Sequence, residues 1–238
     1  MSFSIPSNII LIAIGILPSI IWLLLFLSKD ARPEPKYLLV KVFSFGIIIA
    51  PIVILLEAAV KAISEIDFLP QALVFFGLAA FVEEYMKYWV VKNSVLFKPD
   101  FDEPHDSIIY MITAALGFAA MENILIAFKV YPDGFNATLG VISLRFAGAT
   151  LLHALTSGIV GYFLGLAWFF YHFKKYLVAL GLIIASLLHL VFNYIIFINP
   201  SVALPGNVIL LLGMLILVFI LFDKLRERSQ QVIQRVST

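Results

Sequence analysis

Polar side chains that could take part in catalysis recur in four consecutive apolar runs of this sequence. Run by run, they are Glu83, Glu84 and Lys87; Glu122 and Asn123; His153; and His189 and Asn193. A charged group at the centre of a bilayer costs about 2.5–3.5 kcal/mol on insertion scales, so each such group needs a functional or pairing reason. Their coincidence in successive runs predicts a catalytic or proton-binding site inside the membrane.

The spacing of these residues indicates which of them can meet. Lys87 lies three residues after Glu84 and four after Glu83, so on a helix it can pair with either carboxylate. Two glutamates with one lysine leave an excess negative charge, which in a desolvated site favours one carboxyl as a general acid or base. His189 and Asn193 are four residues apart and share one helix face. The rival interpretation is that Lys87 and a glutamate form an ion pair that only fixes helix packing.

These groups also lie at similar depths along their predicted helices. At about 1.5 Å of rise per residue, Glu83, Glu122, His153 and His189 lie about 18–22 Å from the starts of their runs. The apolar core of a bilayer is about 30 Å thick, so all four groups fall in its interior although alternate helices run in opposite directions. We therefore expect them to converge on one wet cavity. Taken alone, His153 would more often be an interhelical hydrogen-bonding residue than a catalyst.

The elements that must position these residues are membrane-spanning helices. Hydrophobic residues make up 62% of the 238 positions and charged residues only 13%, against about a quarter charged in soluble domains. The predicted fold is all-α, a polytopic transmembrane helix bundle in one membrane domain, residues 1–238. The seven predicted spans are 8–28, 37–62, 70–92, 107–128, 141–171, 176–198 and 206–223.

Charge predicts the orientation and excludes some functions. Most of the 16 Lys and Arg residues fall in the first, third and fifth connectors and the C-terminal tail. By the positive-inside rule, the N-terminus is outside and the C-terminus in the cytoplasm, here of a plasma membrane. A net charge of +1 with no basic stripe excludes nucleic acid as a partner. Without cysteine, the chain has no disulfide and no thiolate nucleophile.

Several short motifs resemble the signature blocks of the PrsW family of intramembrane proteases. They are Glu83–Lys87 (EExxK), Asp102–Asp106 (DEPxD), Leu116–Asn123 (LGFAxxEN), Leu152-His153-Ala154 followed by Gly158 and Gly161, and His189 with Asn193 (HxxxN). The resemblance covers about residues 70–198 in the expected order, with Ser107 where the family pattern has Gly. It implies site-1-like cleavage of a single-span membrane protein, typically an anti-sigma factor. The expected partners are therefore that substrate and the lipid bilayer.

A metal-free mechanism is the preferred hypothesis. Glu83 or Glu84 acts as general base on water, and Lys87 holds the carboxylate that is not used. A tetrahedral oxyanion accepts a hydrogen bond from His189, Asn193 or His153. In this version Glu122 orients a histidine or shuttles protons.

The alternative mechanism requires a metal ion. Glu122, His153 and His189 form a His₂Glu set compatible with catalytic zinc, although the sequence has no HExxH motif. Two other functions remain open, a non-catalytic scaffold of the same fold and a proton-coupled transporter.

The remaining polar residues are assigned to structural roles. Glu57 and Lys61 are predicted to form a local helical pair, and His105 and His172 to be solvated in connectors. Gly158, Gly161 and Gly165 are predicted to allow close helix packing.

Overall fold

The computed structural model describes residues 7–30, 32–64 and 71–237, and these are almost entirely helical, with no strand among them. The predicted connector 64–69 and the first residue of the predicted span 70–92 lie, apart from Ser64, outside the described residues. The long helices are α1 (Ser7–Leu27), α2 (Lys36–Ser64), α3 (Gln71–Ser94), α4 (Asp106–Val130), α5 (Phe135–Arg145), α6 (Leu151–Phe169), α7 (Lys174–Ile198) and α8 (Pro200–Ser237). Short helical pieces join some of them: η1 (Tyr131–Asp133), the π-helical η2 (Phe146–Thr150) and η3 (Tyr171–Phe173).

The predicted all-α transmembrane bundle is confirmed. Because η2 connects α5 to α6 without a break, the fifth predicted span is one helical segment of 35 residues, Phe135–Phe169. In the described chain, six segments are both long and apolar enough to cross a membrane. The helix outside this set is α3, whose 24 residues are long enough but include the charged residues of the predicted site.

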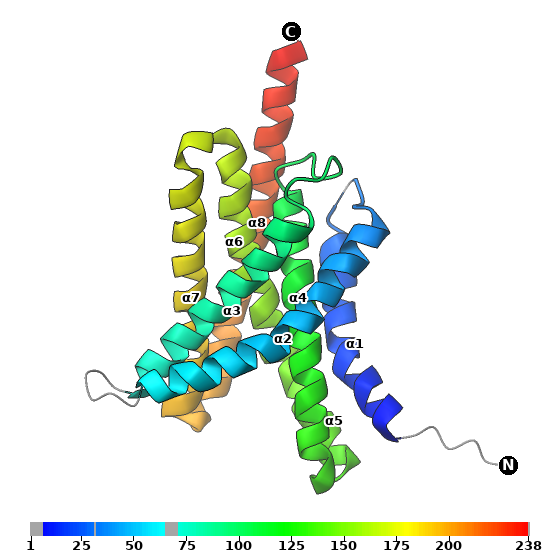
Figure 1. Cartoon of the computed structure of the whole chain (residues 1–238), viewed down its shortest axis with the longest axis vertical. Helices are drawn as coiled ribbons and strands as arrows, with labels where there is room; N and C mark the ends of the chain where they lie inside the picture. Colours follow the sequence, from blue (N-terminus) through cyan, green and yellow to red (C-terminus); the bar gives the residue numbers. More distant parts are fainter. Residues whose placement is uncertain (1–6, 31, 65–70, 238) are drawn as a thin grey trace, which may run out of the picture.

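Helices α4 and α6 form the centre of the bundle. They pack against each other, with α1 and α2 against α4 and with α7 and α8 against α6 (Figure 1). Every residue of α4 from Asp106 to Ala120 is buried, which explains why its apolar residues show little helical periodicity. The position of α4 therefore places Glu122 and Asn123 near the centre of the bundle.

Glycines allow these helices to approach closely. A Cβ atom at Gly117 of α4 would collide with the backbone of Phe43 in α2. On α6, a Cβ atom at Gly161 would collide with the backbone of Ser107 and Ile108 at the start of α4. The predicted packing role of the α6 glycines is confirmed, since no larger residue fits at Gly161 without moving a helix.

The connectors predicted to be cytoplasmic share one end of the bundle. The α1–α2, α3–α4 and α6–α7 connections and the end of α8 lie together, opposite α5 and the start of α1 (Figure 1). His172 is exposed there, as predicted. The prediction for His105 is wrong, because only 3% of this residue is exposed and its ring packs against Phe222 of α8. Burial also lowers the pKa of His105 below its usual value.

Candidate active site

Lys87 lies at the centre of the predicted site and is completely buried. Its ammonium Nζ is 2.9 Å from Oε1 of Glu84 and 3.2 Å from Oε2 of Glu83, so both pairings predicted from the helical spacing form. The same Nζ atom is 2.9 Å from Nδ1 of His153 and 4.5 Å from the centre of the Phe118 ring. One lysine of α3 thus connects both glutamates to α4 and α6.

The two adjacent glutamates have different surroundings. Glu84 is fully buried and accepts hydrogen bonds from Thr156 Oγ1 (3.0 Å) and Ser157 Oγ (2.7 Å) in addition to that from Lys87. Glu83 accepts a hydrogen bond from Lys87, lies beside the carboxyl of Glu57 and lines a cavity. Because donors already engage both oxygens of Glu84, Glu83 is the carboxylate better placed to accept a proton.

His153 is oriented by a carboxylate on the opposite side of its ring. Its Nε2 atom lies 2.8 Å from Oε2 of Glu122, which also accepts a hydrogen bond from Nη2 of Arg145 at 2.9 Å. An ionised carboxylate can only accept and an ammonium can only donate. Nε2 of His153 therefore carries the proton, and Nδ1 is the acceptor that faces Lys87.

Arg145 is a site residue that sequence reasoning missed. It is the last residue of α5, where the helix continues through the π-helical turn η2 into α6. Oδ1 of Asn123 accepts a hydrogen bond from Nε of Arg145 at 2.5 Å, and Nδ2 of Asn123 donates to Thr150 Oγ1 at 3.0 Å. Asn123 therefore holds Arg145, which in turn holds Glu122. Such π-helical turns frequently occur at functional sites, and here the turn separates Arg145 from His153.

His189 of α7 completes the group from the other side. Its ring is perpendicular to that of His153, with centroids 5.1 Å apart. Nε2 lies 3.9 Å from Oε1 of Glu83, and Nδ1 lies 3.5 Å from Oε1 of Glu84. The structure therefore brings together side chains from α3, α4, α6 and α7, the four runs singled out in the sequence.

A metal ion would find its donors in a set that differs from the predicted one. Glu83, His153 and His189 each offer a ligand atom, and these atoms lie within 4.8 Å of one another. The predicted set contained Glu122 instead, but Glu122 contacts the far nitrogen of His153. Glu122 is therefore placed as the carboxylate behind a ligand histidine, an arrangement that fixes the orientation of metal-binding imidazoles.

A cavity of about 370 Å³ leads to Glu83 between α2, α3 and α7. Asn193 lines it, as does Glu57, whose carboxyl lies close enough to Glu83 for the two to interact. The role of Glu57 thus extends beyond the predicted local pair with Lys61. Apolar side chains form the rest of the wall: Phe75, Phe76, Ala79, Ile196 and Phe197.

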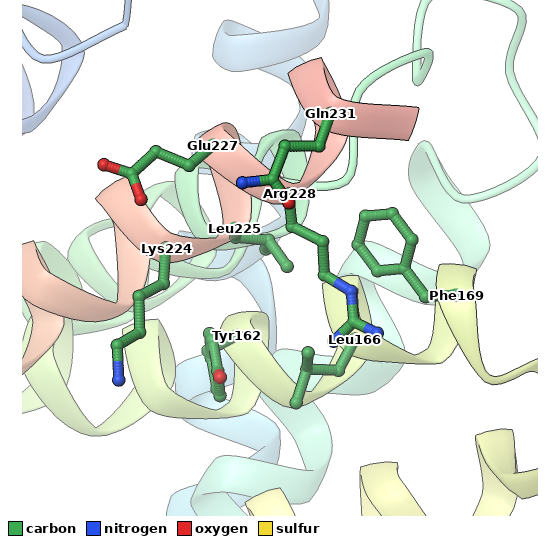
Figure 2. A pocket seen from close by; sticks show the side chains of 8 residues that line it. All are labelled: Tyr162, Leu166, Phe169, Lys224, Leu225, Glu227, Arg228 and Gln231. Atoms are coloured by element: carbon green, nitrogen blue, oxygen red, sulfur yellow. The ribbon is translucent and has the colours of Figure 1, made fainter. Parts of the chain in front are cut away.

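A larger cavity of about 590 Å³ lies elsewhere, between α6 and α8 (Figure 2). Arg228 crosses it and lies over the ring of Phe169, 4.8 Å from the ring centre. None of the predicted catalytic residues lines this cavity; its walls are Tyr162, Leu166, Phe169, Lys224, Leu225, Glu227, Arg228 and Gln231.

A bundle of membrane-spanning length whose interior gathers carboxylates, imidazoles and a lysine defines a polytopic membrane protein with a buried polar site. Comparison with known proteins makes this class specific. The model of the PrsW family of intramembrane metalloproteases matches residues 34–222. The chain therefore belongs to the PrsW family and is an intramembrane peptidase.

Three relatives show how far the similarity extends. Protease PrsW of Clostridioides difficile (strain 630) is 30% identical over 222 residues, which cover 91% of this chain and 90% of that protein. Protease PrsW of Geobacillus kaustophilus (strain HTA426) is 30% identical over 186 residues, which cover 78% of this chain and 79% of that protein. Protease PrsW of Bacillus subtilis (strain 168) is 30% identical over 187 residues, which cover 78% of this chain and 82% of that protein. No solved structure gives a significant match.

Proposed function

We propose that this protein hydrolyses a peptide bond in or near the membrane segment of a single-span membrane protein, such as an anti-sigma factor. The observation that carries the proposal is the convergence of Glu83, His153 and His189 beside a cavity in the bundle. Hydrolysis needs an activated water molecule, a stabilised oxyanion and a proton for the leaving amine. The residues around Lys87 offer each of these functions.

Glu83 is the general base of the proposed reaction. It faces the cavity, whereas the lone pairs of Glu84 are engaged by Lys87, Thr156 and Ser157. Glu83 takes a proton from the attacking water and later passes it to the leaving amine. Glu84 balances the charge of Lys87 and keeps its ammonium in place, so the two adjacent glutamates have different roles in this proposal.

The oxyanion is stabilised from α7. Asn193 lines the same cavity as Glu83, and Nε2 of His189 lies 3.9 Å from Glu83. A donor at this distance from the base can reach the oxygen of a carbonyl group whose carbon is attacked by the water at Glu83. His153 is less suited to donate, since its Nδ1 atom accepts from Lys87 and its Nε2 proton points to Glu122.

A divalent metal ion is the second version of this mechanism, favoured by the same cluster and by the family description. Two imidazoles and a carboxylate within 4.8 Å fit such an ion once the ammonium of Lys87 moves away from Nδ1 of His153, and Glu83, His153 and His189 would then hold it. When bound, it would supply Lewis-acid polarisation and a more acidic water. Glu122 would keep the ring of His153 in position in either version. Exhaustive chelation followed by zinc add-back separates the two versions, because only the metal version loses and regains activity.

The substrate reaches Glu83 through the cavity between α2, α3 and α7. The Phe76 and Phe197 rings meet edge to face at 5.6 Å and give this wall an apolar surface suited to a membrane segment. We place the protein in the plasma membrane with its C-terminus in the cytoplasm, because the basic connectors share one end of the bundle (Figure 1). The site then opens within the membrane, where the substrate helix lies.

Co-expression with tagged single-span proteins tests the proposal. Wild type is expected to give a shortened product, and Glu83→Gln, His153→Ala and His189→Ala to give none at equal membrane levels. Glu227→Gln is the matched control, because Glu227 is exposed on α8 away from the site. A product that persists in all three site variants would overturn the site assignment. No product from any substrate would instead favour a scaffold or a transporter.

A further inference from the structure

The DEPxD motif, Asp102–Asp106, is not used by the proposed active site. Its acidic residues and His105 meet two carboxylates from the α1–α2 connection at the end of the bundle that holds the C-terminus (Figure 1). We call this group the loop cluster; its members are Asp30, Glu34, Glu103, His105 and Asp106. At about 1.5 Å per residue, the start of α4 lies about 24 Å along the helix from Glu122, so the loop cluster is separate from the active site.

The loop cluster contains buried polar atoms without partners. Asp106 is completely buried, and its Oδ2 atom accepts hydrogen bonds from the backbone N–H groups of Asp102 (3.1 Å) and Glu103 (2.8 Å). Within the described residues, Oδ2 of Asp30 and Nδ1 of His105 make no hydrogen bond, and the carboxyl of Asp106 has that of Glu34 as a further side-chain neighbour. Buried polar atoms are rarely left in this state, because each costs about 1–3 kcal/mol. Such atoms are suited to bind a ligand.

Charge in the loop cluster favours a cation. Carboxyl groups of Asp30, Glu34 and Asp106 lie close enough to interact with one another. The guanidinium of Arg32 is 3.2 Å from Glu103, but its side chain is 73% exposed, so it neutralises the buried groups only weakly. Arg226 of α8 also acts on His105. Two arginines face five carboxyls here when Asp102 is included.

We propose that Glu103, His105 and Asp106 bind one divalent metal ion of the zinc type, with Asp30 closing the site from the α1–α2 connection. The three residues each offer a ligand atom, all within 4.8 Å of one another, so small side-chain movements bring them to one ion. Zinc takes imidazole nitrogen and carboxylate oxygen at about 2.0–2.2 Å. His105 already points into the loop cluster, since its Nε2 atom is 3.5 Å from Glu103 and 3.9 Å from Asp30.

The proposed role of the ion is structural. Its ligands join the start of α4 to the α1–α2 connection. The ring of His105 also packs against that of Phe222 in α8, with ring centres 5.2 Å apart. The ion would thus fasten three parts of the chain at one end of the bundle. This proposal is independent of the proposed function, because it involves none of the active-site residues.

Zinc binding by full-length protein in detergent tests the proposal. The test uses a His153→Ala, His189→Ala background, so that the active-site imidazoles cannot hold the metal. After chelation and dialysis against zinc, we expect about one bound zinc ion per chain and a thermal midpoint that rises with zinc concentration. No bound zinc in this background would overturn the proposal.

Variants of the loop cluster complete the test. Adding Asp106→Asn and His105→Gln is expected to weaken zinc binding by about tenfold or more, because ligands are lost. His172→Gln, at an exposed histidine, is the matched control and should bind zinc as its parent does. Should the double change prevent folding, Glu103→Gln, at a residue with a 15% exposed side chain, gives the same comparison. Equal zinc binding by loop-cluster and parent proteins would mean adventitious binding and would refute the site.

Discussion

The adjacent glutamates of α3 offer the sharpest separation of catalysis from stability. Glu83→Gln and Glu84→Gln make the same chemical change one residue apart, so each is the matched control of the other. The structure assigns them different consequences, since Glu83 faces the cavity and Glu84 is the buried partner of Lys87. We expect Glu83→Gln to lose activity and Glu84→Gln to lose both activity and stability.

The magnitudes follow from the contacts of Lys87. Glu84→Gln leaves the fully buried ammonium without its closest counter-charge, and removing one partner of a buried ion pair costs about 3–5 kcal/mol. The thermal midpoint should then fall by on the order of 10 °C for a chain of this size. Glu83→Gln leaves the Glu84–Lys87 pair in place and replaces only the longer, 3.2 Å contact of Lys87 with a neutral acceptor, a cost of about 1 kcal/mol.

The assay combines two readings on the same purified proteins. Thermal unfolding in detergent gives the midpoints, and cleavage of a tagged single-span substrate gives the rates. Loss of a general base lowers the rate by about 10²–10⁴-fold, so Glu83→Gln should show this loss at a nearly unchanged midpoint. The reasoning is refuted if Glu83→Gln cleaves at the wild-type rate, or if Glu83→Gln unfolds earlier than Glu84→Gln.

Other predictions follow from single contacts. Arg145→Ala should lower kcat about 10–100-fold with KM unchanged, because Glu122 then no longer orients His153. The control Lys129→Ala, at an exposed position, should leave kcat unchanged. A raised KM with an unchanged kcat in Arg145→Ala would contradict this prediction. Glu57→Gln should shift the pH profile of kcat/KM, since its carboxyl interacts with Glu83, and an unchanged profile would remove it from the site. Gly117→Val should prevent accumulation of folded protein, because the new side chain collides with the backbone of α2. Gly140→Ala, at a position with open space around it, should give the same size-exclusion profile as wild type.

The sequence predicted the features of the site that depend on position along a helix. The pairing of Lys87 with Glu83 and Glu84 follows from helical spacing alone, and it forms as predicted. The convergence of groups from four successive helices followed from their similar depth. The seven-helix organisation followed from the length of the apolar runs, although the charges of α3 leave, among the described residues, six segments that are apolar enough to qualify by composition.

Features that depend on rotation about a helix axis could not be predicted in this way. Depth does not say which face of α4 points to the two histidines, so the alternative mechanism grouped Glu122 with them, whereas Glu83 is the carboxylate that lies with both in the structure. Arg145 was not predicted as a site residue, because the π-helical turn that follows it has no clear sequence signal. His105 lies in a connector that reads as polar and exposed, yet the loop folds against α8 and buries it.

The central claim is that Glu83 activates water for peptide hydrolysis. The most direct measurement is mass spectrometry of the products formed by reconstituted protein from a single-span substrate in ¹⁸O-labelled water. Wild type is predicted to give a new C-terminal carboxyl that carries the label, and Glu83→Gln, folded to the same midpoint, to give no product. Labelled product formed equally by both proteins would contradict the account.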